Sequence, residues 1–150
     1  SPQWKDKLKF FIRHKIKVCF TQGLDIRLVN EENAFYLAQT HYYDRHFRKK
    51  ALYFAFDDPK LESILPEKIK ILNANGIPNR HLRFYEIVGF DTTFEQDMRR
   101  YEVLIQLGVM PFIMLYNNTK DKQLRRFARW VNKRYSQVVP FEEFMVQRKP

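Results

Sequence analysis

The sequence predicts an α/β fold: a partial (β/α) barrel arc of about four parallel strands, with helices on the outer face. Apolar runs begin near residues 17, 52, 82 and 111, and a spacing of roughly thirty residues is the length of one strand–helix–strand unit. The runs do not alternate with polar residues, which indicates strands buried on both faces of a parallel sheet. The connections are single helices of similar length, which favours the barrel arc over an open doubly wound domain.

The composition fits one domain and restricts the chemistry. A chain of 150 residues with 45% hydrophobic and 16% aromatic residues can bury a sizeable core, so we expect a single domain over residues 1–150. The formal net charge of +10 favours either anionic partners or solubility. Cys19 is the only cysteine, which excludes an intramolecular disulfide and suits a reducing, cytoplasmic setting. The longest apolar run, 109–116, is far shorter than a membrane span, so no membrane partner is expected.

The chain opens with an amphipathic helix followed by the first strand. Trp4, Leu8 and Phe11 recur at helical spacing, and lysines occupy the other faces. The run from residue 16 predicts a buried strand through about residue 20. Gly23 then allows a bend or a close approach of the backbone.

The second helix and strand follow. Asn30 predicts a helix start, whereas the aromatic and basic segment 42–50 fits either a continuation of this helix or an ordered loop. Residues 52–56 form the second predicted strand. Asp58 as a cap and Pro59 at the first helical position strongly predict a helix after it.

The second half contains two more strand–helix units. Pro66 is expected to kink or split the third helix, which ends near residues 75–76. Residues 82–88 form the third predicted strand, and Thr93 with Gln96 indicates a capping box that opens the next helix.

The fourth predicted strand, 111–116, leads to a last long helix with a basic face. This face has two interpretations: a solvated helix surface, which we favour, or a surface that binds nucleic-acid phosphates. Its basic residues are Lys122, Arg125, Arg126, Arg129 and Lys133.

Polar residues cluster where each predicted strand ends, and parallel strands bring these ends to one rim, the face that carries sites in such folds. Asp57 is suited to accept a hydroxyl proton, Gly89 to let a ligand approach the backbone, and Tyr116 to stack on a ring. Helix capping, an Asp25–Arg27 pair and loop solvation are the alternative explanation. The candidate residues are Gln22, Asp25, Arg27, Asp57, Gly89, Thr92, Tyr116 and Asn117. No spacing matches a known catalytic motif, so no catalytic residue is assigned.

The histidines and the cysteine give no metal site. His41 and His46 are five residues apart, a spacing that does not place two ligands on one helical face. We interpret these two residues, His14 and His81 as structural, and Cys19 as a core residue.

Four stretches together resemble the C-terminal part of the core of a radical S-adenosylmethionine (radical SAM) enzyme, in a poorly characterised bacterial and phage-associated branch. The stretches are 20–28, 52–57, 85–97 and 127–132. The resemblance implies a partial (β/α)6 barrel in which a [4Fe-4S] cluster cleaves S-adenosylmethionine to a 5′-deoxyadenosyl radical. The family holds its cluster with a Cys-x3-Cys-x2-Cys loop after the first strand, and this chain lacks that loop. We therefore expect the last four units of the core, with the missing N-terminal part as a partner and neither cofactor bound to this fragment alone.

The resemblance also implies roles for individual residues. Gly89 and the turn to Thr93 would lie beside the methionyl and adenosine parts of the cofactor, although Phe90-Asp91-Thr92 replaces the usual Leu-Pro-Gly. Asp57 would lie near the ribose, and Tyr116 with Asn117 would flank the adenine. The earlier group, Gln22, Asp25 and Arg27, would face cofactor or substrate.

An arc of four strands leaves two unpaired edges. We expect the terminal helices or a second copy of the chain to cover them. Self-association through sheet edges is therefore one expected partner interaction, and a basic module that binds nucleic acid through the last helix is the alternative function.

Overall fold

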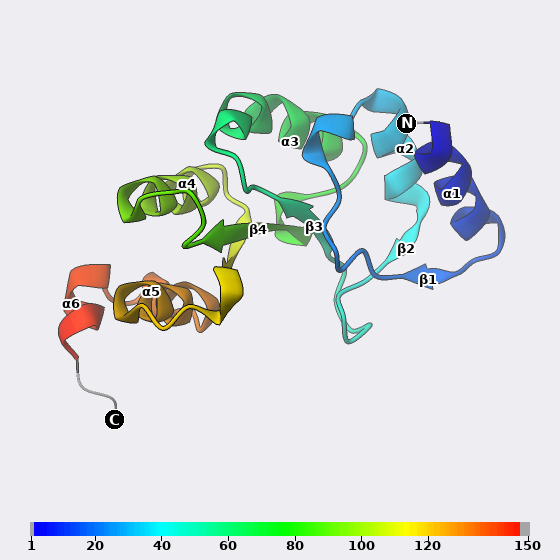
Figure 1. Ribbon diagram of the computed structural model, residues 1–150. Coiled ribbons are helices and arrows are strands. Elements are labelled where there is room, and N and C mark those ends of the chain that lie inside the picture. Colours follow the sequence, from blue (N-terminus) through cyan, green and yellow to red (C-terminus); the bar gives the residue numbers. More distant parts are fainter. Residues whose placement is uncertain (1, 148–150) are drawn as a thin grey trace.

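The main sheet of the computed structural model contains three parallel strands in chain order. The structure describes residues 2–147. Strands β3 (Leu52–Ala55), β4 (Leu82–Val88) and β5 (Met110–Leu115) lie side by side in that order (Figure 1). The α/β class and the parallel sheet are therefore confirmed.

The prediction of four strands in one arc is not met by this sheet. The first apolar run forms only β1 (Lys17–Val18), which pairs with β2 (His41–Tyr42) in a separate two-stranded parallel sheet. Gly23 has a positive φ of 84°, and the chain then touches β3 at a single point, where the Leu24 amide donates to the Tyr53 carbonyl at 2.6 Å. The run becomes polar after Phe20, so only Leu24 extends the sheet there.

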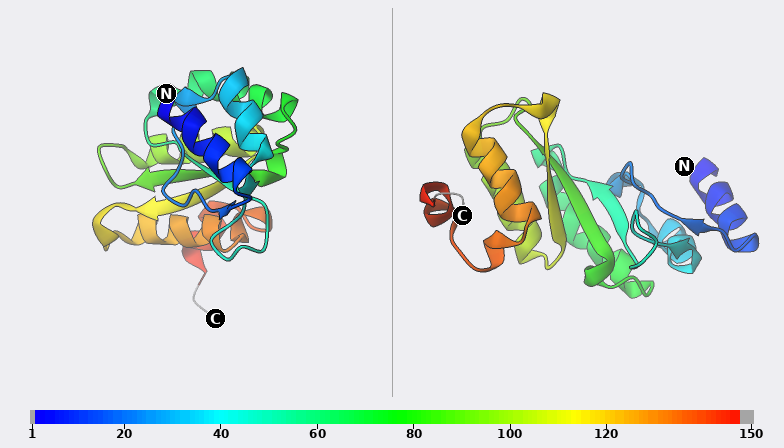
Figure 2. Two further views of the ribbon diagram at one scale, coloured as in Figure 1. Left: turned by 90° about the vertical axis from the view of Figure 1, so that its right-hand side faces the viewer. Right: turned by 90° about the horizontal axis from the view of Figure 1, so that it is seen from below.

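Six α-helices surround these strands in residues 2–147. Helices α3, α4 and α5 lie on one side of the main sheet, α1 and α2 pack together near the small sheet, and α6 lies beside α5 (Figures 1 and 2). The helix α6 is absent from the sequence-based expectation. Their bounds are α1 Pro2–Arg13, α2 Glu31–Gln39, α3 Leu65–Ala74, α4 Phe94–Gln106, α5 Lys122–Asn132 and α6 Phe141–Val146. None of these helices is long and apolar enough to cross a bilayer.

The helix starts follow the predicted caps. Asn30 accepts the Asn33 amide at 2.8 Å, and both halves of the capping box between Thr93 and Gln96 are present. Pro66 splits the third helix as expected: a 3-10 segment, η2 (Pro59–Ile64), precedes α3.

The helices cover only one face of the main sheet. Alternate residues such as Phe54, Phe84 and Ile113 pack against α3, α4 and α5 and are buried. The strand residues between these positions point to the other face. There Tyr53 and Tyr85 are buried beside Cys19, whereas Phe112 remains 40% exposed. Right-handed crossovers between strands in chain order place all helices on one side, which explains the uncovered face.

The outer edge of β5 is closed by a side chain from α5. Asn132 donates from Nδ2 to the Ile113 carbonyl at 2.9 Å and accepts the Ile113 amide at 2.8 Å. Pro111, on the same strand, has no amide hydrogen to leave unpaired. The Asn132 side chain thus takes the place of a neighbouring strand and occupies backbone groups that could otherwise pair with another chain.

We predict that Asn132→Ala lowers the free energy of unfolding by about 1–3 kcal/mol, because two partly buried backbone groups of Ile113 lose their partner. Urea denaturation followed by circular dichroism measures the change. Gln123→Ala, an exposed position on the same helix, is the matched control and should be nearly neutral. Equal stability of the two variants would show that Asn132 does not secure this edge.

Candidate functional site at the carboxyl ends of the strands

The carboxyl ends of β3, β4 and β5 form one rim. Asp57 follows β3, the turn with Gly89 and Thr92 follows β4, and Tyr116 with Asn117 follows β5. Since the three strands are parallel and adjacent, their following residues meet at the same edge of the sheet.

Asp57 is the acid of this rim, and its side chain is exposed. Its Oδ1 accepts the Ile87 amide at 3.4 Å, so the end of β3 contacts the end of β4. Burial raises the pKa of Asp57, and the Ile87 amide and the positive charge of Arg100 oppose the rise. Within residues 2–147 its Oδ2 has no hydrogen-bond partner, which leaves an oxygen free to accept a ligand hydroxyl.

An aromatic pair lies on the same rim. The rings of Phe90 and Tyr116 are 4.6 Å apart between centroids and tilted by 40°, and the two residues are 57% and 41% exposed. Asn117 follows with a positive φ of 50°. Exposed rings on the same rim as an acid suit a ligand that has both a planar ring and hydroxyl groups. Phe90 was part of the predicted turn but was not among the predicted site residues.

The remaining candidates make contacts within the fold. Asp25 and Arg27 form a bidentate ion pair, with 2.8 Å between Arg27 Nη2 and Asp25 Oδ2, as the structural interpretation predicted. The Thr92 hydroxyl donates to Asp97 Oδ1 at 2.6 Å and so secures the start of α4. Gln22 lies exposed after β1.

The local structure itself explains why residue 89 is a glycine. It has a positive φ of 86°, and a Cβ built on it would lie 3.1 Å from Leu124 Cδ1. Both the conformation and the close contact with α5 therefore favour glycine at this position.

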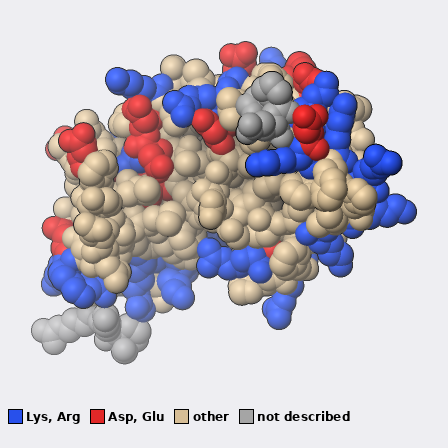
Figure 3. Space-filling model, turned by 45° about the vertical axis from the view of Figure 1, so that its right-hand side comes forward, with Lys and Arg blue, Asp and Glu red and all other residues tan. Residues whose placement is uncertain are grey.

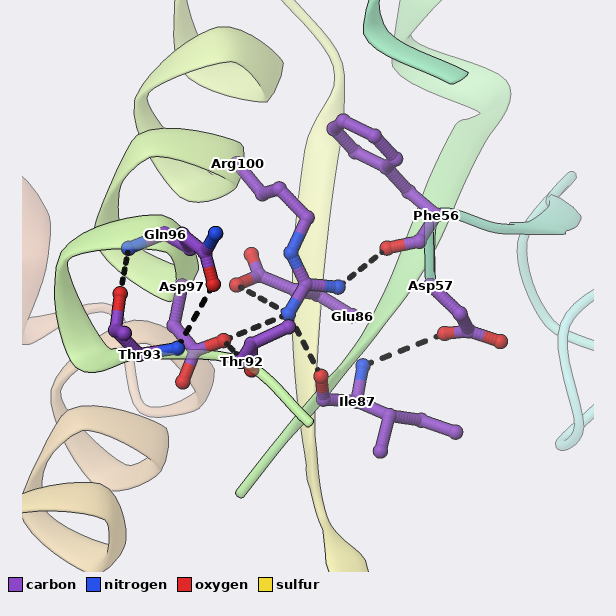
Figure 4. A network of polar contacts seen from close by, with 9 residues as sticks. All are labelled: Phe56, Asp57, Glu86, Ile87, Thr92, Thr93, Gln96, Asp97 and Arg100. Atoms are coloured by element: carbon purple, nitrogen blue, oxygen red, sulfur yellow. Dashed lines mark hydrogen bonds and ion pairs between the residues drawn. The ribbon is translucent and has the colours of Figure 1, made fainter. Parts of the chain in front are cut away.

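A buried arginine lies beneath the rim and joins three elements (Figure 4). Arg100, on α4, is only 2% exposed. Its Nη1 donates to the Phe56 carbonyl at 2.7 Å, and its Nη2 donates to the Ile87 carbonyl at 2.8 Å and to Asp97 Oδ1 at 2.7 Å. The guanidinium thus ties the ends of β3 and β4 to α4.

Glu86 lies beside this guanidinium and is completely buried. Its Oε2 is 3.8 Å from Arg100 Nη2, and neither carboxyl oxygen has a hydrogen-bond partner among the described residues. Burial raises the pKa of Glu86 from 4.5 to about 8, and the positive charge of Arg100 only partly opposes this. One guanidinium already paired with Asp97 does not fully compensate a second buried carboxylate, so burial favours the protonated form of Glu86.

Sequence reasoning missed this network, although two signals were present. Glu86 interrupts an otherwise apolar buried strand, and Asp97 and Arg100 are three residues apart on a helix, which places them on one face. A cavity of about 350 Å³ adjoins Arg100 between η2 and the start of α4. It is lined by Phe56, Pro59, Glu62, Thr93, Glu95, Gln96, Arg99 and Arg100, and by none of the predicted site residues.

We predict that Glu86→Gln removes a pH dependence of stability. The pKa of Glu86 is about 8 in the folded chain and 4.5 in the unfolded chain. The contribution of Glu86 to the free energy of unfolding is therefore fully present below pH 4.5 and is lost as the pH rises toward 8. The unfolding free energy of the wild type minus that of Glu86→Gln should therefore fall with rising pH, by up to about 1.4 kcal/mol per pH unit.

Urea denaturation at several pH values tests this prediction. Glu102→Gln, an exposed carboxylate on α4, serves as the control and should give a difference that is flat with pH. A flat or rising difference for Glu86→Gln would mean that Glu86 is ionised in the folded protein.

Comparison with known proteins assigns no family to this chain. No family model, curated protein or solved structure matches it. Its site is therefore interpreted from its own residues and geometry.

Proposed function

We propose that this chain forms part of a radical SAM enzyme and that its rim binds the nucleoside part of S-adenosylmethionine. The observation that carries the proposal is the joint position of Asp57 and the Phe90–Tyr116 pair, an acid and two exposed rings at the carboxyl ends of adjacent parallel strands. The order and spacing of the four sequence stretches support the same family.

The sheet topology also supports a barrel arc within the whole protein. The strand order β3-β4-β5 follows the chain without reversal, and α3, α4 and α5 lie on one side (Figure 1). A doubly wound domain reverses its strand order and carries helices on both faces. We therefore propose that the uncovered face lines the inside of a partial barrel whose other units lie outside these 150 residues.

The residues of this chain do not fit an iron–sulfur cluster. Such clusters are held by several cysteine thiolates, whereas Cys19 is the only cysteine and packs against the Ala51–Tyr53–Tyr85 cluster. Across residues 2–147 no three His, Cys, Asp or Glu side chains gather to hold a metal. In the proposed enzyme, the ligands of a cluster would come from another part of the protein.

The rim offers side chains of the kinds that hold an adenosine group. Asp57 would accept a ribose hydroxyl through its free oxygen, and Phe90 with Tyr116 would provide a surface for the adenine ring. When S-adenosylmethionine is bound in a complete radical SAM site, it supplies hydrogen-abstraction chemistry. The role of this chain is to bind and orient the nucleoside and to fix the rim through Arg100.

The test uses the full-length protein reconstituted with iron and sulfide, with 5′-deoxyadenosine formation as the readout. We predict that 5′-deoxyadenosine forms and that Asp57→Asn raises the KM for S-adenosylmethionine about tenfold, because the variant weakens a hydrogen bond from a hydroxyl to a carboxylate. Asp6→Asn, on α1 and exposed, is the control and should leave the KM unchanged.

Two results would contradict the proposal. Failure of the full-length protein to hold a cluster and to cleave S-adenosylmethionine would exclude the radical SAM assignment. Cleavage with an unchanged KM in Asp57→Asn would retain the family and exclude the role of the rim acid.

A further inference from the structure

A second cavity opens on the uncovered face of the sheet, at the opposite end from the rim. It measures about 300 Å³, near the lower end of the range of roughly 300–1,000 Å³ for ligand pockets. Strands β3, β4 and β5, the loop after β2 and the residues at the end of α5 all contribute to it. The side chains used below are those of Arg45, Arg83, Arg134, Tyr53, Tyr85 and Phe112.

The three arginines of this pocket have no carboxylate partner among residues 2–147. Arg83 donates from Nη1 to the Tyr53 hydroxyl at 3.2 Å, and its Nε is buried without a partner. Arg134 donates to the sulfur of Met110 at 3.1 Å, and a thioether is a weak acceptor.

Asp44 is the one acid that lines the pocket, and its Oδ1 is occupied by the backbone amides of His46 and Arg48. Three arginines against this aspartate leave a net charge of +2 when His46 is neutral. The pocket therefore favours an anion such as a phosphate group.

The aromatic side chains of the pocket add a second feature. Tyr53 and Tyr85 are stacked with 5.4 Å between ring centroids, and Phe112 meets Tyr85 edge-on at 5.9 Å. The Tyr85 side chain is buried, and within the described residues its hydroxyl makes no hydrogen bond of good geometry. Arg45 lies close enough to this hydroxyl to oppose the rise that burial causes in the pKa of Tyr85. Phe112 leaves part of its ring open to solvent, so a planar group can stack beside the arginines.

A basic groove along α5 continues from this pocket. It measures about 570 Å³ and contains no acidic side chain. Asn132 lines both the groove and the pocket, which makes the two adjacent at the edge of β5. Figure 3 shows Lys and Arg side chains along the lower edge of the molecule, where α5 lies in Figure 1, and acidic side chains mostly in the upper half. The basic residues of the groove are Lys120, Lys122, Arg125, Arg126, Arg129 and Lys133.

We propose that the groove and the pocket together bind a single-stranded nucleic acid. Lys122, Arg125 and Arg129 contact successive phosphates along α5, and one nucleotide enters the pocket, where its base stacks on Phe112 and its phosphate lies among the arginines. A basic track beside an exposed ring is the arrangement by which proteins hold single strands, whose unpaired bases are free to stack. A duplex keeps its bases paired and cannot fill the pocket. The inference uses none of the rim residues, so it is tested separately from the radical SAM assignment.

The test measures binding of a fluorescein-labelled oligouridine to the 150-residue chain by anisotropy over a range of salt concentrations. We predict that Arg125→Glu/Arg129→Glu weakens binding at least about tenfold and reduces the salt slope by about 1.4, or about 0.7 for each phosphate that is no longer neutralised. Phe112→Leu should weaken binding about tenfold because the base cannot stack on leucine, and Phe112→Tyr should restore it. Lys7→Glu/Lys70→Glu changes the net charge equally at exposed positions on α1 and α3 and should have little effect.

Other outcomes would overturn the proposal. An equal loss of affinity in Lys7→Glu/Lys70→Glu would show that binding depends on net charge alone. Equally tight binding of a duplex, of polyglutamate or of free uridine monophosphate would exclude a single strand as the specific ligand. Circular dichroism of every variant shows whether weaker binding reflects loss of the fold.

Discussion

The buried guanidinium of Arg100 is the interaction on which the rim depends. It donates to the Phe56 carbonyl just after β3, to the Ile87 carbonyl near the end of β4 and to an acid of α4 at the same time. These bonds fix the position of the Gly89 turn relative to Asp57. Its charge is balanced by Asp97, whereas burial raises the pKa of the neighbouring Glu86 and so favours the neutral form of that carboxyl group. The Arg100–Asp97 ion pair lowers the cost of burying both charges inside the fold.

Much of the fold follows from local sequence, and the exceptions have physical causes. Strand β4 and the start of α4 match the predicted bounds, because a mainly apolar run and a capping box are local signals. The pairing of β1 with β2 was not predicted, since strands of two residues are defined by their partners. Likewise Glu86 and Arg100 lie 14 positions apart and meet only when α4 packs on β4. Helix α6 is six residues long and depends on packing against α5.

The uncovered face connects the two proposed sites. Right-handed crossovers place α3, α4 and α5 on one side of the sheet, so alternate residues of each strand remain available on the other. The carboxyl ends of the strands carry an acid and an exposed aromatic pair, which suit a nucleoside. The amino ends carry arginines around stacked tyrosines, which suit a phosphate. The predicted site residues account for most of the first site, while the second combines a loop, three strands and the end of α5 in a way that no local motif shows.

Hydrogen exchange of the full-length protein, with and without S-adenosylmethionine, would show whether the nucleoside lies on the rim. If it does, the cofactor should slow exchange of the backbone amides near Asp57, in the turn after β4 and around Tyr116, and should leave α1 unchanged. Protection confined to other segments, or none at these three positions under saturating cofactor, would contradict the assignment of the rim as the nucleoside site.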